Sequence, residues 1–183
     1  ISLDGLGSAH DKIRGINQAF TKFKQTIKII KKMKIKDVTA GMTICKYNYK
    51  QIENVWKLAE QNGLEFSCFL PEVSDYYFNN KLNEQPTLKL NTSMKNTIIK
   101  KLKAFKYHYY MDNLRLRLEK NIQRSLPCYS GYTSIVIDPY GNVRPCLLRN
   151  EVFGNLKNKS LKEILFDKHG WKIRKKLESC SCW

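Results

Sequence analysis

The segment CYSGYTSIVIDPYGNVRPC, residues 128–146, decides the fold expected for the C-terminal part of the chain. Thr133 to Ile137 has the composition of a strand. The next four residues, Asp138-Pro139-Tyr140-Gly141, place Asp, Pro and Gly at the first, second and fourth positions of a type I turn. Asn142 to Arg144 then returns antiparallel. The hairpin is therefore predicted to bring Cys146 back toward Cys128.

Helical signals follow the hairpin. Gly154-Asn155 predicts a turn, and Ser160 with Glu163 forms a capping box that predicts the start of a helix. His169-Gly170 is expected to interrupt this helix, and a second helical stretch should run from Trp171 to Leu177. The hairpin and the returning helix are thus predicted to bring the end of the chain back toward the hairpin.

Four of the six cysteines lie in residues 128–183, namely Cys128, Cys146, Cys180 and Cys182. Four thiolates at one point suit tetrahedral zinc or an iron-sulfur cluster. Spacing alone does not choose between these metals. A C-x-C pair is less usual than C-x2-C for either one, because two ligands must leave one site from nearly adjacent positions.

Strands and helices alternate in the first 71 residues. Ile1 and Leu3 alternate with polar residues as in a strand, and strands are also predicted from Val38 to Cys45 and from Leu64 to Leu70. Asn48 is the expected N-cap of the second helix. The helix faces comprise Ile16, Phe20, Phe23, Ile27 and Ile30 in the first helix, and Ile52, Val55, Trp56 and Ala59 in the second. The order predicts parallel α/β units with right-handed crossovers.

The composition indicates three regions. Residues 1–74 form the α/β part, residues 75–126 a polar loop and helical connector, and residues 127–183 the cysteine-rich part. The chain starts on Ile1 within a predicted strand, so we expect an internal fragment of a longer protein.

The net charge of +17 arises from 33 basic and 16 acidic residues. It suits an anionic partner, but dispersed lysines without a recognition motif do not favour nucleic acid. No run is long enough to span a membrane, and no signal peptide precedes the first strand. The sequence therefore predicts a cytoplasmic, reducing setting.

The cysteine pattern resembles a known family. Cys128 is followed after twelve residues by Gly141 and after four more by Cys146, then by G-N-L at residues 154–156 and S-L-K-E-I at residues 160–164. This order resembles the SPASM/twitch extension of radical S-adenosylmethionine (SAM) enzymes. ISLDG followed by H-D-x-I-R-G at residues 10–15 resembles the fourth strand and following loop of their barrel. The resemblance implies the C-terminal part of a partial (β/α)6 TIM-like barrel, followed by a small α+β domain with a β-hairpin.

Binding residues in the barrel are implied by the same resemblance. Ser2 and Arg14 match positions that lie against the ribose or the methionine carboxylate of SAM, and Asp4 is directed the same way. Asn48, just past the next strand, is a further candidate. The residues alone leave open that Ser2 and Asp4 cap the following turn and that Arg14 pairs with Asp11.

The resemblance also implies the activity and the cofactors. The complete enzyme would cleave SAM reductively to a 5'-deoxyadenosyl radical that abstracts hydrogen from a peptide or protein, a sugar or a nucleotide-derived substrate. The four C-terminal cysteines would hold an auxiliary 4Fe-4S cluster, and a reductant such as ferredoxin or flavodoxin would supply electrons. A second 4Fe-4S cluster needs a C-x3-C-x2-C loop that this chain lacks, so the chain alone should be inactive. Cys45 and Cys68 are expected in the core.

Two other classes remain open. The end Cys180-Ser181-Cys182 differs from the usual C-x2-C of single-cluster relatives, and a further ligand beyond Trp183 would complete the set. A basic four-cysteine zinc module that binds nucleic acid is one alternative. An iron-sulfur electron-transfer protein without a SAM site is the other.

Overall fold

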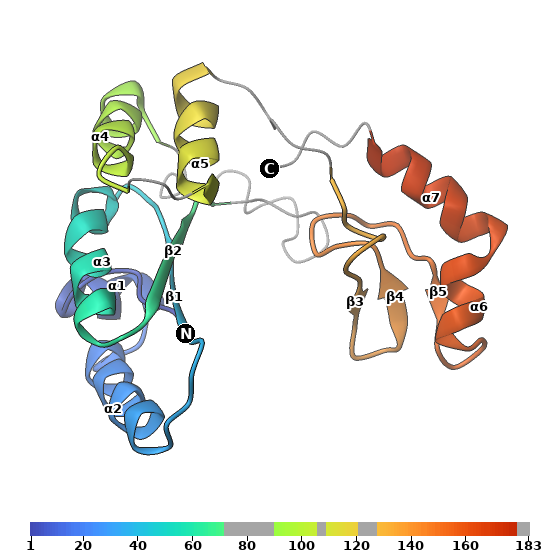
Figure 1. The fold of residues 1–183 in the computed structure, drawn as a ribbon, viewed down its shortest axis with the longest axis horizontal. Coiled ribbons are helices and arrows are strands. Elements are labelled where there is room, and N and C mark those ends of the chain that lie inside the picture. The colour runs from blue at the N-terminus through green and yellow to red at the C-terminus, as the bar shows by residue number, and fades with distance from the viewer. Residues whose placement is uncertain (72–89, 106–108, 121–127, 179–183) are drawn as a thin grey trace. The chain divides into compact units, whose positions relative to one another are not determined.

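The computed structural model describes residues 1–71, 90–105, 109–120 and 128–178, which form two compact units (Figure 1). Among these residues, unit 1 comprises 1–71, 90–105 and 109–120, and unit 2 comprises 128–178. Cys180 and Cys182 lie outside the described residues.

Unit 1 contains a parallel sheet. Strands β1 (Thr39–Thr43) and β2 (Glu65–Phe69) pair in parallel. The start of the chain adds to β1 through a parallel bridge between Ser2 and Gly41, in which Leu3 N–H donates to Gly41 O at 2.8 Å. The predicted parallel α/β arrangement is confirmed. The described residues contain no closed barrel, so the partial barrel remains a prediction.

The rest of the described part of unit 1 is mainly helical. The helices are α1 (Ser8–Arg14), α2 (Ala19–Lys32), the 3-10 turn η1 (Tyr49–Gln51), α3 (Ile52–Gln61), α4 (Thr92–Leu102) and α5 (Tyr109–Lys120). The buried residues of α2 and α3 lie on the predicted faces: Phe23 and Ile27, and Ile52, Val55 and Ala59.

The first helical region differs from the prediction at its start. Ile16, expected on the buried face, lies before α2 and is 51% exposed. The carboxylate of Asp11 accepts the N–H groups of Gln18 and Phe20 at 3.1 and 2.7 Å, which fixes the beginning of α2 after Ile16. The predicted loop around His10 is the helix α1, which ends at Gly15 in the left-handed conformation (φ 64°).

Helices α4 and α5 share the core of unit 1. The ring of Phe105, just after α4, lies 4.4 Å from the ring of Trp56 and 5.7 Å from that of Phe66, measured between centroids. Met111 of α5 is fully buried, and its sulfur lies 3.4 Å from Cys68 Sγ. The helical segment therefore packs on the sheet as part of the same hydrophobic core.

Unit 2 is built on the predicted hairpin. Strands β3 (Val136–Ile137), β4 (Asn142–Arg144) and β5 (Gly154–Asn155) form an antiparallel sheet in this order. Gly141 N–H donates to Asp138 O at 2.9 Å, so the turn is confirmed. The turn predicted at Gly154-Asn155 begins at Asn155, whose carbonyl oxygen accepts Asn158 N–H at 3.0 Å, but Gly154 and Asn155 themselves form β5. These residues pair with β4 because the preceding Phe153 donates its N–H to Val143 O and buries its ring in the core.

Two helices complete unit 2. The predicted capping box of Ser160 and Glu163 is confirmed at the start of α6 (Leu161–Phe166). The predicted interruption between two helices is confirmed, but it lies at Asp167 rather than at His169-Gly170. Helix α7 (Lys168–Glu178) begins earlier than predicted because Asp167 caps it by accepting Gly170 N–H at 2.7 Å. The two helices and the sheet enclose one hydrophobic core of Val143, Phe153, Ile164, Ile173 and Leu177.

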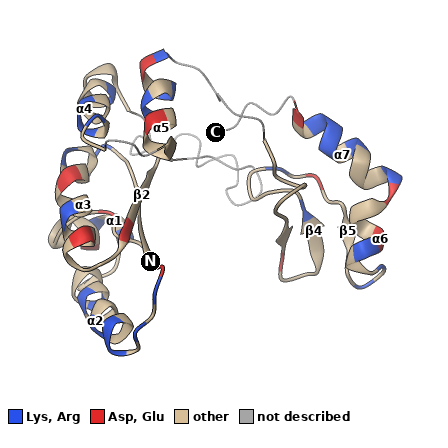
Figure 2. Ribbon diagram, in the orientation of Figure 1, with Lys and Arg blue, Asp and Glu red and all other residues tan. Residues whose placement is uncertain are grey.

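Basic residues predominate on several helices, most clearly on α2 and α7 (Figure 2). Residues 22–36 include seven lysines and no acidic residue. Within the described part of the chain, every helix is too short or too polar to cross a membrane.

Candidate functional site

Gly131 is the point where three segments of unit 2 meet. Its φ is +80°, and a Cβ at this position would lie 2.9 Å from Phe153 Cζ. The same Cβ would lie 3.3 Å from Leu177 Cδ1 and 3.3 Å from Pro145 Cβ. Only glycine allows the neighbouring segments to approach this closely without strain.

Each of these segments carries a predicted ligand. Gly131 follows Cys128 by three residues, and Pro145 directly precedes Cys146. Leu177 precedes Cys180 by three residues, and a three-residue stretch of chain spans at most about 11 Å. The two described thiols of unit 2, Cys128 and Cys146, are half-buried. The contacts at Gly131 thus bring the segment of each described cysteine against the helix that leads to the other two.

A buried carboxylate holds the hairpin in shape. Asp138 Oδ1 accepts the N–H groups of Tyr140 and Asn142 at 2.9 and 3.0 Å. Its Oδ2 accepts from Asn142 Nδ2 at 2.9 Å and pairs with Arg144 Nε at 3.3 Å. Arg144 in turn donates to Asn150 O at 3.0 Å. This network connects the turn, β4 and the loop that follows Cys146, so the hairpin is well fixed.

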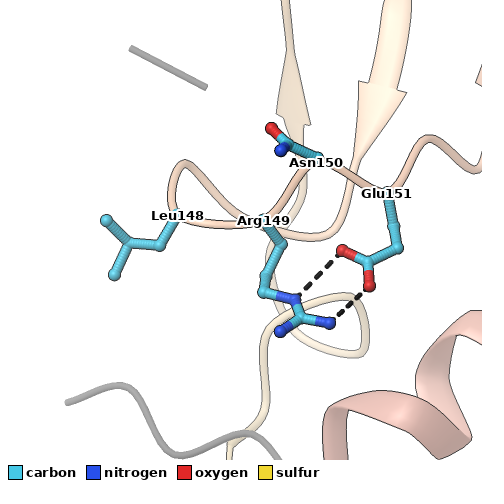
Figure 3. A pocket seen from close by; sticks show the side chains of 4 residues that line it. All are labelled: Leu148, Arg149, Asn150 and Glu151. Carbon is cyan, nitrogen blue, oxygen red and sulfur yellow. Dashed lines mark hydrogen bonds and ion pairs between the residues drawn. The ribbon is translucent and has the colours of Figure 1, made fainter. Parts of the chain in front are cut away.

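The loop after Cys146 lines a pocket. Its lining consists of Leu148, Arg149, Asn150 and Glu151 (Figure 3). Arg149 and Glu151 point toward each other and form a two-point ion pair, with Arg149 Nε 3.0 Å from Glu151 Oε2. The hydrogen bonds from Arg149 hold the pKa of the Glu151 carboxyl below its ordinary value. The positive charge of Arg149 and the negative charge of Glu151 therefore compensate each other.

The donor chemistry of unit 2 fits a sulfur-ligated metal. The described residues contain no group of three or more His, Cys, Asp or Glu side chains that could hold a metal ion. Cys128 and Cys146 offer the soft sulfur ligands that zinc and iron-sulfur clusters use. The described residues of unit 2 therefore fit part of such a site, and ligation by Cys180 and Cys182 stays a prediction.

In unit 1, a cluster of polar side chains lies at the carboxyl ends of the parallel strands. Asp4 Oδ2 pairs with Arg14 Nε at 2.8 Å, and Asp4 Oδ1 accepts Thr43 N–H at 2.8 Å. The Asp4 side chain is 5% exposed, whereas that of Arg14 is 37% exposed. The alternative in which Arg14 pairs with Asp11 is wrong, because Asp4 takes this role and Asp11 caps α2.

His10, the first residue of the H-D-x-I-R-G motif, also belongs to this cluster. Asp4 N–H donates to His10 Nδ1 at 3.0 Å, and the ring is 3% exposed. Phe20 and Phe23 lie beside it, with ring centroids 6.2 and 6.3 Å away. Burial lowers the pKa of His10 from its ordinary 6.5, against the opposing effect of Asp4. The ring is therefore neutral near pH 7, with Nδ1 as the acceptor.

The amide of Asn48 is fully engaged with the backbone. Its Nδ2 donates to Asp4 O and to Thr43 O, both at 2.8 Å, and its Oδ1 accepts Cys45 N–H at 2.7 Å. The residue has no exposed surface. Asn48 does occupy the predicted N-cap position, before η1, but its side chain makes no capping hydrogen bond because its amide is already bonded to the strand ends. Asn48 joins the ends of two strands.

Ser2 lies on the strand that leads to Asp4. It is exposed and pairs with Gly41 in the parallel bridge. The structure thus brings Asp4, Arg14 and Asn48 into one cluster, and Ser2 precedes this cluster by two residues on the same strand.

Residues 128–183 match the family model of SPASM, the iron-sulfur cluster-binding domain. The match covers the hairpin, α6, α7 and the four C-terminal cysteines, Cys128, Cys146, Cys180 and Cys182. A SPASM segment implies binding of an iron-sulfur cluster, and such domains occur in radical SAM enzymes as auxiliary-cluster domains. No curated protein and no solved structure matches the chain.

Two residues of unit 2, Gly131 and Arg174, were not predicted to belong to the site. Gly131 stands in a short polar stretch, and no local pattern separates it from an ordinary turn glycine. Arg174 had a detectable signal, because residues 170, 173, 174 and 177 follow the spacing of a buried helix face. A cation at one of these positions indicates a buried charge.

Proposed function

We propose that the chain is part of a radical SAM enzyme in which Cys128, Cys146, Cys180 and Cys182 hold an auxiliary 4Fe-4S cluster. The convergence of three segments on Gly131 carries this proposal, since each segment leads within three residues to one of these cysteines. The SPASM match over the same residues supports iron over zinc.

The residues of unit 2 would fix the cluster's surroundings. The cluster, when bound, supplies one-electron transfer at this site. The Asp138–Arg144 pair keeps the base of the hairpin rigid, and Phe153 and Leu177 close the side next to Gly131 against water. Rigid and dry surroundings favour a defined reduction potential.

The polar cluster of unit 1 would bind SAM in the complete enzyme. Asp4 holds Arg14 by Nε, which leaves the outer guanidinium nitrogens of a partly exposed side chain to meet the methionine carboxylate. Exposed Ser2 would approach the ribose, and Asn48 would fix the strand ends behind Asp4. Residues outside this chain would hold the second 4Fe-4S cluster, which is needed for reductive cleavage of SAM.

The partners follow from this assignment. A low-potential electron carrier such as ferredoxin or flavodoxin would deliver electrons. The substrate would be a peptide or another acidic molecule, in keeping with the charge of +17. The reaction would be hydrogen abstraction from an unactivated C–H bond of that substrate.

Iron and sulfide analysis tests the ligand assignment. In the whole protein purified anaerobically, alanine at any of the four C-terminal cysteines should remove the iron and sulfide of one cluster. Cys45→Ala is the matched control, since Cys45 is a buried cysteine of unit 1 and should leave the metal content unchanged. Full cluster content in all four alanine variants would exclude the assignment.

SAM affinity tests the role of Arg14. A hydrogen bond to a charged group contributes about 1.5–3 kcal/mol, so Arg14→Met should weaken SAM binding roughly 10- to 100-fold in calorimetry of the whole protein. Lys12→Met is the control, because Lys12 lies on the same helix over the ring of Tyr47. Equal SAM affinities of the Arg14→Met and Lys12→Met proteins would show that Arg14 does not bind SAM.

A further inference from the structure

Arg174 is a buried cation in the middle of α7. The residue is 6% exposed. Its Nε donates to Gly131 O at 2.7 Å, and its Nη1 donates to Leu165 O at 2.7 Å. The guanidinium carbon also lies 5.0 Å from the ring centroid of Phe153 and 5.6 Å from those of Tyr132 and Trp171. Backbone carbonyls and aromatic rings thus surround this charge.

No carboxylate within the described residues forms an ion pair with Arg174. The other two arginines within residues 128–178 differ in this respect, because Arg144 pairs with Asp138 and Arg149 pairs with Glu151. A buried charge without an opposite charge is costly, and proteins usually pair it or neutralise it. The carbonyls and the C-terminal end of α6 compensate the cation only in part.

The position of Arg174 indicates where a compensating negative charge would lie. Its hydrogen bond goes to the carbonyl of Gly131, at which the cysteine-bearing segments meet. Arg174 also lies three residues before Leu177, which is about one helical turn nearer to Cys180. Its guanidinium therefore lies beside the backbone of Gly131, three residues after Cys128.

We propose that Arg174 is the counter-charge of the iron-sulfur cluster and raises the cluster's reduction potential. This inference rests on the proposed ligation by the four cysteines. Four thiolates leave a 4Fe-4S cluster negatively charged, and one-electron reduction adds a further negative charge. A nearby fixed cation stabilises the reduced form more than the oxidised form.

The surroundings of Arg174 strengthen this effect. The three rings exclude water from the guanidinium, so its field is screened less than that of a surface lysine. Within the described part of the chain, Arg174 has no hydrogen bond to Cys128 or Cys146. It would act through the Gly131 carbonyl and through space, which makes it a positioning residue. A purely structural clamp between α6, α7 and Gly131 would use the same hydrogen bonds, but would not require a charge.

A redox titration monitored by electron paramagnetic resonance distinguishes a counter-charge from a purely structural clamp. The whole protein is purified anaerobically, and the auxiliary cluster is identified as the signal that Cys146→Ala removes. Arg174→Gln keeps a hydrogen-bond donor but loses the charge, Arg174→Met loses both, and Arg174→Lys keeps the charge. Lys172→Met is the matched control, because it removes a cation from an exposed position of the same helix.

Charge loss should make reduction at least tenfold less favourable, which corresponds to a shift of 59 mV to more negative potential for one electron. Arg174→Lys should remain close to the wild type, and Lys172→Met should change the equilibrium less than twofold. An Arg174→Gln protein that keeps its cluster at the wild-type potential would overturn the inference. If Arg174→Met does not hold a cluster, the Gln and Lys variants decide between the roles. Absence of any such cluster in the wild type would instead refute the proposed function.

Discussion

Replacement of Gly131 by alanine should weaken unit 2 more than the same change at any other turn glycine of this unit. Two costs add at this position. A residue with a Cβ at φ +80° is strained by about 1–2 kcal/mol. In addition, the Cβ would lie 2.9 Å from the buried ring of Phe153, and overpacking of a core typically costs about 1–3 kcal/mol. The sum is a loss of about 2–5 kcal/mol.

Gly141→Ala is the matched control for this change. Gly141 has φ +86°, so the backbone strain is similar, but its nearest neighbour is the side-chain oxygen of Asn155 at 3.3 Å, in a partly exposed turn. The control should lose only about 1–2 kcal/mol. The difference between the two variants, about 1–3 kcal/mol, measures the packing of the segments that carry the cysteines.

Amide hydrogen exchange read from β4 and α7 gives the opening free energy of unit 2 without interference from unit 1. We expect faster exchange in Gly131→Ala than in Gly141→Ala, and loss of cluster iron only in the former. Equal exchange in both variants would refute the close convergence at Gly131.

Three further predictions concern other buried groups. The unfolded chain takes up a proton on His10 near pH 6.5 and the folded chain only at lower pH, so unit 1 should lose stability as the pH falls below 6.5, by up to about 1.4 kcal/mol per unit of pKa difference. Urea unfolding should show this decline in the wild type and less of it in His10→Gln; the same decline in both would argue against the role of His10. Burial raises the pKa of Cys68 to about 12, so this thiol should resist iodoacetamide at about pH 8 in the native protein, and its modification under those conditions, seen by mass spectrometry, would contradict its burial. Arg144→Met leaves the buried Asp138 carboxylate without its cation and should cost roughly 3–5 kcal/mol in hydrogen exchange of β4, whereas a loss below about 1 kcal/mol would indicate that the pair is dispensable.

Local signals predicted the hairpin and the start of α6 correctly. The turn at Asp138–Gly141 and the capping box at Ser160 depend on contacts within a few residues, and both are confirmed. The parallel sheet of unit 1 was also predictable, because strands that alternate with helices leave few other arrangements.

Predictions failed where distant parts of the chain decide the structure. Gly154 and Asn155 have the composition of a turn but form β5, because Phe153 anchors this segment in the core. Gly170 resembles a helix breaker, yet it lies within α7, where a Cβ would be 3.1 Å from the carbonyl oxygen of Ile164. Asn48 resembles an N-cap, but its partners include Asp4, which lies 44 residues away in sequence.

In the candidate site, too, local sequence signals were predictive and contacts between distant segments were not. Cysteine spacing and turn chemistry identified Cys128 and Cys146 as ligand candidates, and the SPASM match supports cluster binding by this segment. The meeting of segments at Gly131 depends on tertiary packing, so the sequence could not predict it. The helical spacing around Arg174 indicates that this residue is buried, but its carbonyl partners Gly131 and Leu165 are fixed only by tertiary packing. In unit 1, the ion pair between Asp4 and Arg14 likewise requires the strand and helix to be placed in space.

X-ray absorption at the iron and zinc edges, on the whole protein purified anaerobically, tests the central claim most directly. The proposed function predicts iron with sulfur neighbours and a short iron–iron distance, and it predicts that Cys146→Ala removes one cluster's share of this signal. Zinc bound by four sulfurs in unit 2, without acid-labile sulfide and with iron unaffected by Cys146→Ala, would contradict the proposal.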